Sequence, residues 1–189
     1  MKKTEAKTYG LFGLSLSKRL AFAAAFAALC AVSTLLITIP LPFGYFNTGD
    51  VFVLLAGWCL GPLYGAIAAG VGSALADIIA GFAVYAPATF VIKALDAAVA
   101  FWAFYAFKKL IKSEKLDFLP RAISAVFGEI VMVIGYFLYE LILYGAAGAV
   151  STLVGNGLQA ACCLILATAI IAALYPIKKV KEFFPALKK

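Results

Sequence analysis

Long apolar runs dominate this chain of 189 residues and restrict its fold more than any other feature does. Hydrophobic residues make up 65% of the sequence and charged residues only 13%, and the mean hydropathy is +1.04. Soluble domains carry about 25% charged residues. A helix needs roughly 20 apolar residues to cross a bilayer, so this length accommodates about six short-looped spans and no separate soluble domain. Any chemistry must therefore take place among the helices.

Proline and glycine divide the apolar sequence into its expected spans. Pro40 ends the first span and opens a loop rich in proline, glycine and aromatic residues. The stretch 50–81 is too long for one helix, and Gly61-Pro62 is the natural place for an inner turn. The six expected spans are 20–39, the two halves of 50–81, 85–107, 122–144 and 152–175, with a small outward-facing loop at 145–151. The sequence therefore predicts an all-α bundle of six transmembrane helices.

Basic residues form three groups, each of which flanks an apolar run. They account for 15 of the 16 lysines and arginines: Lys2, Lys3, Lys7, Lys18 and Arg19; Lys108, Lys109, Lys112, Lys115 and Arg121; Lys178, Lys179, Lys181, Lys188 and Lys189. The positive-inside rule makes all three groups cytoplasmic, so 50–81 must cross twice and both termini lie inside the cell. We therefore expect a cytoplasmic segment at 1–19, a transmembrane domain at 20–176 and a cytoplasmic tail at 177–189. The same clustering favours a membrane surface and argues against nucleic acid as a partner.

Polar side chains gather in the half of the spans that faces outward in this topology. Such groups are costly in hydrocarbon and therefore tend to line a bundle interior or a cavity. Residues three, four or seven apart share one helix face, which gives three stripes: Thr89, Lys93 and Asp96; Tyr136, Glu140 and Tyr144; Thr152, Asn156 and Gln159. We expect the stripes to surround a ligand pocket with aromatic walls. The predicted substrate-binding residues are Asn47, Asp50, Asp77, Tyr85, Thr89, Lys93, Asp96, Tyr136, Glu140, Tyr144, Asn156 and Gln159.

Other interpretations of these residues remain open from the sequence. Lys93 could simply neutralise Asp77 or Asp96 in a structural pair. Tyr136 and Tyr144 could belong to the aromatic belt at the membrane interface. Each residue alone therefore carries little weight, and the prediction of a pocket depends on the convergence of the whole set at one depth.

The residues that catalysis usually needs are missing. The chain has no histidine, which removes Ser-His and Cys-His pairs and histidine-ligated metal sites. The nucleotide-binding pattern G-x-x-x-x-G-K-[ST] is also absent from the sequence. We therefore expect no enzyme activity, no catalytic residue, no metal site and no cofactor, and we expect a role in binding or transport.

Alanines crowd the first expected span, where they leave little side-chain bulk. Small residues four apart let another helix approach closely, and such packing drives helix association in lipid. This face could dock a partner protein, or it could pack against the protein's own helices.

Four motifs follow one another in the segment 44–97. They are N-x-G-D at 47–50, Leu-Gly-Pro at 60–62, G-S-x-L-A-D at 72–77 and Y-x-P-A-T-x-x-I-K at 85–93. The ordered set resembles the substrate-binding S components of energy-coupling factor (ECF) vitamin transporters. The resemblance implies a multi-pass protein of the prokaryotic cell membrane that binds a water-soluble vitamin or precursor with high affinity from outside.

The resemblance also implies partner proteins. A coupling transmembrane subunit and two ATPase subunits would supply ATP hydrolysis, and membrane lipid would surround the bundle. In this family the coupling subunit meets an A-x-x-x-A pattern on the first helix. Ala24 and Ala28 match it best, and Ala23 and Ala27 offer a competing register.

The substrate is the least determined part of the prediction. One lysine, several carboxylates and amides, and many aromatic side chains suit a small heteroaromatic ring with hydroxyl groups, such as pyridoxine or a hydroxymethylpyrimidine. A shared fold does not fix the ligand. The alternative function is a stand-alone secondary transporter driven by a proton or sodium gradient, in which Asp77, Lys93 and Glu140 would be the coupling sites.

Overall fold

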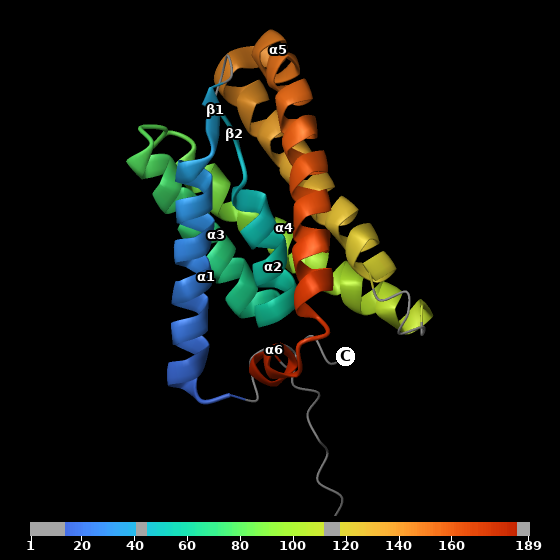
Figure 1. The fold of residues 1–189 in the computed structure, drawn as a ribbon. Helices are drawn as coiled ribbons and strands as arrows, with labels where there is room; N and C mark the ends of the chain where they lie inside the picture. The colour runs from blue at the N-terminus through green and yellow to red at the C-terminus, as the bar shows by residue number, and fades with distance from the viewer. Residues whose placement is uncertain (1–13, 41–44, 112–117, 185–189) are drawn as a thin grey trace, which may run out of the picture.

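The structure is a computed structural model that describes residues 14–40, 45–111 and 118–184. Within these residues it is built almost entirely from helices (Figure 1). The elements are α1 (Leu16–Leu36), β1 (Thr38–Pro40), β2 (Tyr45–Asn47), α2 (Gly49–Leu60), α3 (Pro62–Ile79), α4 (Ala86–Leu110), α5 (Phe118–Leu174) and α6 (Lys178–Phe183). The predicted all-α membrane fold is confirmed, apart from one short antiparallel hairpin that the sequence did not indicate. In this hairpin Thr38 of β1 lies opposite Asn47 of β2.

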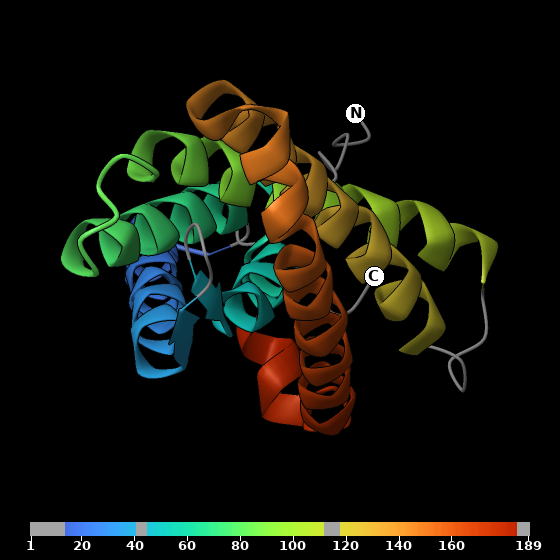
Figure 2. The ribbon, with the colours of Figure 1, turned by 90° about the horizontal axis from the view of Figure 1, so that it is seen from above.

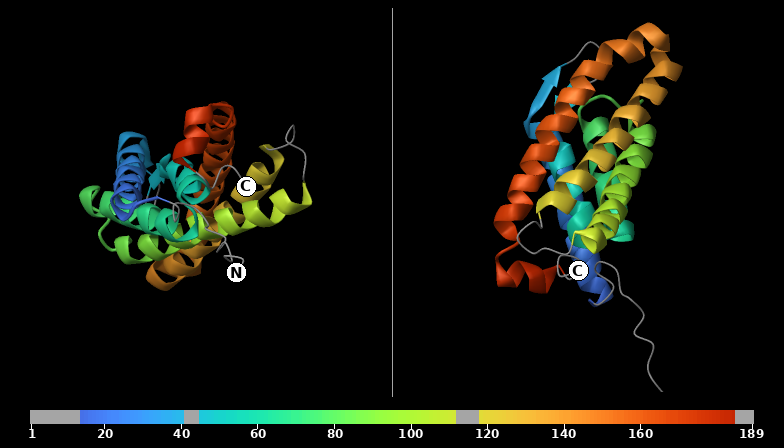
Figure 3. Two further views of the ribbon diagram at one scale, coloured as in Figure 1. Left: turned by 90° about the horizontal axis from the view of Figure 1, so that it is seen from below. Right: turned by 90° about the vertical axis from the view of Figure 1, so that its right-hand side faces the viewer.

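Helix α5 contains the fifth and sixth predicted spans in one element, so the six predicted helices are not matched one for one. It runs for 57 residues, which would make a straight rod of about 85 Å, far longer than a bilayer is thick. At Gly145 the backbone leaves the helical conformation (φ 71°, ψ −178°), and the chain folds back into two arms, 118–144 and 146–174 (Figure 3). The expected loop at 145–151 is therefore wrong. One glycine makes the reversal because it adopts positive φ without strain.

The spans agree with a multi-pass membrane protein. Helices α1, α3, α4 and α5 are long and apolar enough to cross a membrane, whereas α2, with 12 residues, is shorter. The reversal between α2 and α3 falls at Gly61, where φ is 86°, and Pro62 begins α3, as the sequence predicted. Eleven of the twelve residues of α2 are buried. Figure 2 shows why: α2 lies in the middle of the bundle and contacts α1, α3, α4 and α5.

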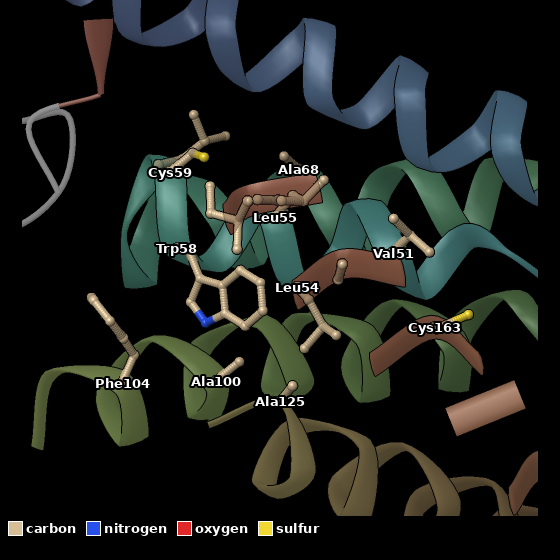
Figure 4. Packing of buried hydrophobic residues seen from close by; sticks show 14 residues of the cluster. Val51, Leu54, Leu55, Trp58, Cys59, Ala68, Ala100, Phe104, Ala125 and Cys163 are labelled. Carbon is tan, nitrogen blue, oxygen red and sulfur yellow. The ribbon is translucent and has the colours of Figure 1, made fainter. Parts of the chain in front are cut away.

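Apolar side chains of α2, α4 and α5 pack against one another in the half of the bundle where α2 ends. Figure 4 shows Trp58 of α2 against α4, close to Ala100 and Phe104. Its indole Nε1 donates a hydrogen bond of 3.0 Å to Ser124 of α5, so the tryptophan joins three helices. The guanidinium of Arg121 is buried 4.3 Å from the ring centre of Phe104. This packing holds α2, α4 and α5 together.

The two ends of the molecule differ in charge. The lower end in Figure 1 contains the start of α1, the end of α4 and the whole of α6. The hairpin and the bend of α5 lie toward the upper end. The basic residues of the lower end include Lys18 in α1, Lys108 and Lys109 in the last turn of α4, and Lys178 in α6. Arg121 differs from the surface position that its basic group suggested, because its side chain is buried. Seven other members of the basic groups lie outside the described residues: Lys2, Lys3, Lys7, Lys112, Lys115, Lys188 and Lys189.

Candidate ligand-binding site

A polar pocket lies between β2, the α3–α4 connection and the adjoining ends of α3, α4 and the two arms of α5. It encloses about 390 Å³ of space between atoms, including its mouth. The lining residues are Tyr45, Asn47, Asp77, Phe82, Tyr85, Thr89, Tyr136, Glu140, Asn156 and Gln159. The pocket therefore opens at the end of the bundle opposite α6.

Aromatic rings form a continuous part of the pocket wall. The ring centres of Tyr45 and Phe82 are 4.9 Å apart, and that of Phe82 is 6.4 Å from that of Tyr85. Tyr85 lies 6.4 Å from Tyr136 in turn, with an interplanar angle of 47°. Aromatic faces of this kind stack on flat apolar groups, while the tyrosine hydroxyls provide hydrogen bonds. The wall thus suits a planar ligand with polar substituents.

Two carboxyl groups lie in the pocket, and hydroxyl groups hold them in place. The Tyr45 hydroxyl donates a hydrogen bond of 2.6 Å to Asp77 Oδ1. Burial of the hairpin tyrosine, reinforced by this carboxylate, raises the pKa of Tyr45 and keeps the donor protonated. Glu140 accepts hydrogen bonds from the hydroxyls of Thr152 and Tyr85. The two carboxyl groups are therefore oriented before any ligand arrives.

A second set of polar groups lies beside and beneath the pocket; we call Asn47, Asp50, Lys93 and Gln159 the buried network. Lys93 forms an ion pair with Asp50, and their side chains are 3% and 0% exposed. Gln159 Nε2 donates to Asp50 Oδ2 at 2.6 Å, and its Oε1 accepts from the backbone N–H of Asn47 at 2.8 Å. These contacts join β2, α2, α4 and the second arm of α5. Asn47 and Gln159 also line the pocket and so belong to both regions.

The structure brings most of the predicted site residues together. Eight of the twelve line the pocket: Asn47, Asp77, Tyr85, Thr89, Tyr136, Glu140, Asn156 and Gln159. The interpretation of Lys93 as a structural group fits its position, although its partner is Asp50 and not the Asp77 or Asp96 that we considered. Asp50 and Lys93 thus lie in the buried network and not in the pocket lining.

Two further predicted residues lie away from the pocket lining. Asp96 is buried against Gly128, where an added Cβ would come within 2.4 Å of its Oδ1. Neither carboxyl oxygen of Asp96 has a hydrogen-bond partner within the described part of the chain, and the same holds for Glu129. Tyr144 is 39% exposed, and its ring centre lies 6.4 Å from that of Tyr85.

Tyr45 and Phe82 line the pocket without having been predicted. Both lie in connections between helices, where helical spacing gives no guide. One signal for Tyr45 was available, because residues two apart on a strand share a face and Tyr45 precedes Asn47 by two positions. For Phe82, only its place between Asp77 and Tyr85 could have indicated the site.

These observations define a class: a multi-pass helical membrane protein with a small polar pocket at one end of the bundle. The family described as "ECF-type riboflavin transporter, S component" matches residues 15–176 of this chain. The chain therefore belongs to this family of S components, as its ordered motifs indicated. It is a substrate-binding subunit of an ECF-type transporter and not an enzyme.

Two known proteins are similar to this chain. The chain is similar to a solved structure described as "Structure and mechanism of the S component of a bacterial ECF transporter", with a TM-score of 0.61 and 25% sequence identity. The match covers 85% of this chain and 96% of that one. A protein of Pyrococcus woesei, described as "Uncharacterized protein in gap 3'region", is 38% identical over 137 residues, which is 71% of this chain and 86% of the relative.

Proposed function

We propose that this chain binds a water-soluble vitamin in the pocket and delivers it with a coupling transmembrane subunit and two ATPase subunits. One observation carries the proposal: polar groups and aromatic rings from β2, α3, α4 and both arms of α5 converge at one end of an apolar bundle. Such a concave site, with a few convergent polar groups, is typical of small-molecule binding. The missing nucleotide-binding pattern agrees with ATP hydrolysis by partner subunits.

The ligand that we favour is a compact heteroaromatic ring with hydroxyl or amino groups, such as pyridoxine or a hydroxymethylpyrimidine. The space inside the pocket is small, about 390 Å³ even when its open mouth is counted, and this favours a compact ligand. Riboflavin is the second candidate, because the family description names it and its flat ring would use the same aromatic wall. All of these vitamins combine one planar face with several hydrogen-bonding groups.

Binding to the purified chain tests this proposal. Pyridoxine, hydroxymethylpyrimidine and riboflavin would each be titrated by calorimetry into the full chain in detergent. We expect one of them to bind with a dissociation constant below about 1 μM, equivalent to roughly −8 kcal/mol. Native mass spectrometry of the same preparation would reveal a co-purified vitamin. If no water-soluble vitamin bound or co-purified, the proposal would be overturned.

Uptake measurements separate the proposed function from a stand-alone secondary transporter. Proteoliposomes would contain the chain alone, or the chain with the coupling subunit and both ATPases. We expect uptake of the bound vitamin only with the complete set and ATP. Uptake by the chain alone that collapsed with a proton or sodium gradient would instead establish the alternative function.

We further propose that Ala24 and Ala28 on α1 dock the coupling subunit. Both are exposed, whereas Ala23 and Ala27 are half-buried toward the bundle. The backbone oxygen of Ala27 lies so close to Gly72 of α3 that an added Cβ would come within 2.2 Å of it. The second register therefore packs against the protein's own helices. The first leaves a small-residue face free for another helix.

A bulky side chain on the free face tests this docking register. We expect Ala24→Trp to prevent assembly with the coupling subunit, measured by co-purification, while vitamin binding to the isolated chain is unchanged. Ala169→Trp is the matched control, because Ala169 is exposed on the second arm of α5, outside the proposed docking face. Equal co-purification of both variants with the coupling subunit would overturn the register.

We also propose that the pocket faces outward and that both termini are cytoplasmic. The basic residues of α1, α4 and α6 support this orientation, because positive charge is enriched on the cytoplasmic side. In intact cells, a membrane-impermeant thiol reagent is expected to label Ala146→Cys, at an exposed position beside the bend of α5, and not Lys178→Cys, both made in a variant with its native cysteines replaced. The reverse labelling would place the pocket on the inner side.

A further inference from the structure

The charged groups of the pocket are of one sign. Asp77 and Glu140 are its two ionisable carboxyl residues, and the described lining contains no lysine or arginine. The pocket adjoins a low-dielectric bundle in which an unbalanced charge is costly. A negatively charged ligand would therefore meet two carboxyl groups and no opposing cation.

Lys93 does not supply that cation. Its ammonium group is paired with Asp50, and both side chains are almost completely buried outside the pocket lining. The same ammonium group lies 5.2 Å from the centre of the Tyr136 ring. Withdrawing the lysine toward a ligand would leave Asp50 buried without its counter-charge, which is strongly unfavourable. The ion pair thus removes Lys93 from ligand recognition.

Two buried polar atoms of the pocket have open hydrogen-bonding capacity. Asp77 Oδ2 and Asn156 Nδ2 make no hydrogen bond within the described chain, and their residues are only 6% and 9% exposed. The Thr89 hydroxyl shares a hydrogen bond of 2.9 Å with that of Tyr136 and also lies within reach of Asp77 as a donor, so the open capacity of Asp77 is partial, whereas that of Asn156 Nδ2 is complete. A buried polar atom without a partner has lost its hydrogen bonds to water and destabilises the folded protein. A ligand that satisfies both atoms would remove this cost.

We propose that the pocket selects an uncharged or cationic vitamin that donates a hydrogen bond to Asp77 Oδ2 and accepts one from Asn156 Nδ2. The inference rests on the proposed function and narrows its substrate class. A hydroxyl, amino or protonated ring nitrogen group supplies the donor, and a ring nitrogen or hydroxyl supplies the acceptor. Carboxylated and phosphorylated forms of the same vitamins are excluded by charge.

Matched ligand pairs test the inference on the unmodified chain. Each pair joins an uncharged vitamin to an anionic relative: pyridoxine with 4-pyridoxate, hydroxymethylpyrimidine with its 5-carboxylate, and riboflavin with its phosphate. For the vitamin that binds, we expect the anionic member to bind at least about 100-fold more weakly. The first two pairs replace one hydroxymethyl group by a carboxylate, so ligand size is nearly constant.

The outcomes separate the two proposals. If an anionic member binds as tightly as its uncharged partner, the charge selection is wrong and the vitamin-binding function stands. If neither member of any pair binds, the proposed function itself fails and the inference fails with it. Weaker binding of the anionic member alone supports both.

A variant series then assigns the selection to Asp77. We expect Asp77→Asn to weaken binding of the uncharged vitamin about tenfold and to reduce the discrimination against its anionic relative by a similar factor. Asp96→Asn is the control, because Asp96 is a buried carboxyl outside the pocket lining. Unchanged discrimination in Asp77→Asn would refute the role of this residue. If that variant does not fold, the ligand pairs on the unmodified chain still decide the proposal.

Discussion

The pocket and the buried network use the same kinds of residue in opposite ways. In the network, Lys93, Asp50 and Gln159 satisfy one another through an ion pair and hydrogen bonds. In the pocket, Asp77 and Asn156 keep one buried polar atom each without a partner in the described chain. Polar groups that satisfy each other stabilise the arrangement of helices. Polar groups that line the pocket and keep open hydrogen-bonding capacity are available to a ligand.

The difference follows from where the helices are close together. Helix α2 is enclosed by four neighbours, so a polar group on it, such as Asp50, finds partners within the protein. The pocket residues lie where β2, the α3–α4 connection and the arms of α5 leave space between them. The comparison predicts that substitutions in the network lower stability, whereas substitutions in the pocket lower ligand affinity.

The largest effect is expected for Asp50→Ala. This change leaves Lys93 buried without its counter-charge, which costs about 3–5 kcal/mol in the free energy of unfolding. Thermal unfolding of the ligand-free protein in detergent would measure the loss. The double variant Asp50→Asn with Lys93→Met removes both charges and should recover much of the stability. A fully stable Asp50→Ala protein would show that the ion pair does not hold the helices.

Gln159→Ala should affect both regions, because Gln159 belongs to each. The change removes hydrogen bonds to Asp50 and to the backbone of Asn47, and hydrogen bonds that involve charged groups contribute about 1.5–3 kcal/mol. We expect stability to fall by about 2 kcal/mol and ligand affinity to fall about tenfold. Unfolding and calorimetric titration of the same sample would measure the two effects. A loss in only one of them would place Gln159 in a single region.

Asn156→Ala should separate the regions most clearly. Its Nδ2 has no partner in the described chain, so removing it costs the folded protein little. The ligand loses one hydrogen bond, and we expect about tenfold weaker binding with stability unchanged to within about 0.5 kcal/mol. Leu153→Ala provides a control on an exposed position of the same arm. A large loss of stability in Asn156→Ala would assign this residue to the structural group instead.

Helical spacing was enough to predict much of the pocket. Thr89, Tyr136, Glu140 and Asn156 line the pocket because each lies on a polar stripe of a transmembrane helix. The depth of those stripes followed from the direction assigned to each helix by charge. Local periodicity and charge therefore carried the prediction wherever the site is built from long helices.

Features that depend on tertiary contacts escaped this reasoning. The partner of Lys93 is Asp50, which became a neighbour only because the short helix α2 packs inside the bundle. The reversal at Gly145 needs a single residue, whereas small residues over 145–151 suggested a loop. Tyr45 lies on a hairpin whose pairing is not visible in hydropathy.

Tyr45→Phe is expected to give the smallest effect and tests whether the hairpin belongs to the pocket. The change removes the hydroxyl that donates to Asp77 Oδ1 and keeps the ring against Phe82. A hydrogen bond to a charged acceptor contributes about 1.5–3 kcal/mol, but water or the ligand replaces part of it at an open site, so we expect roughly three- to tenfold weaker binding. Stability should change little, because the aromatic packing is retained. Tyr139→Phe is a matched control, since its hydroxyl bonds to the backbone of Val84 and it does not line the pocket. If Tyr45→Phe destabilised the ligand-free protein without changing affinity, the hairpin would belong with the buried network and the pocket would begin at Asp77.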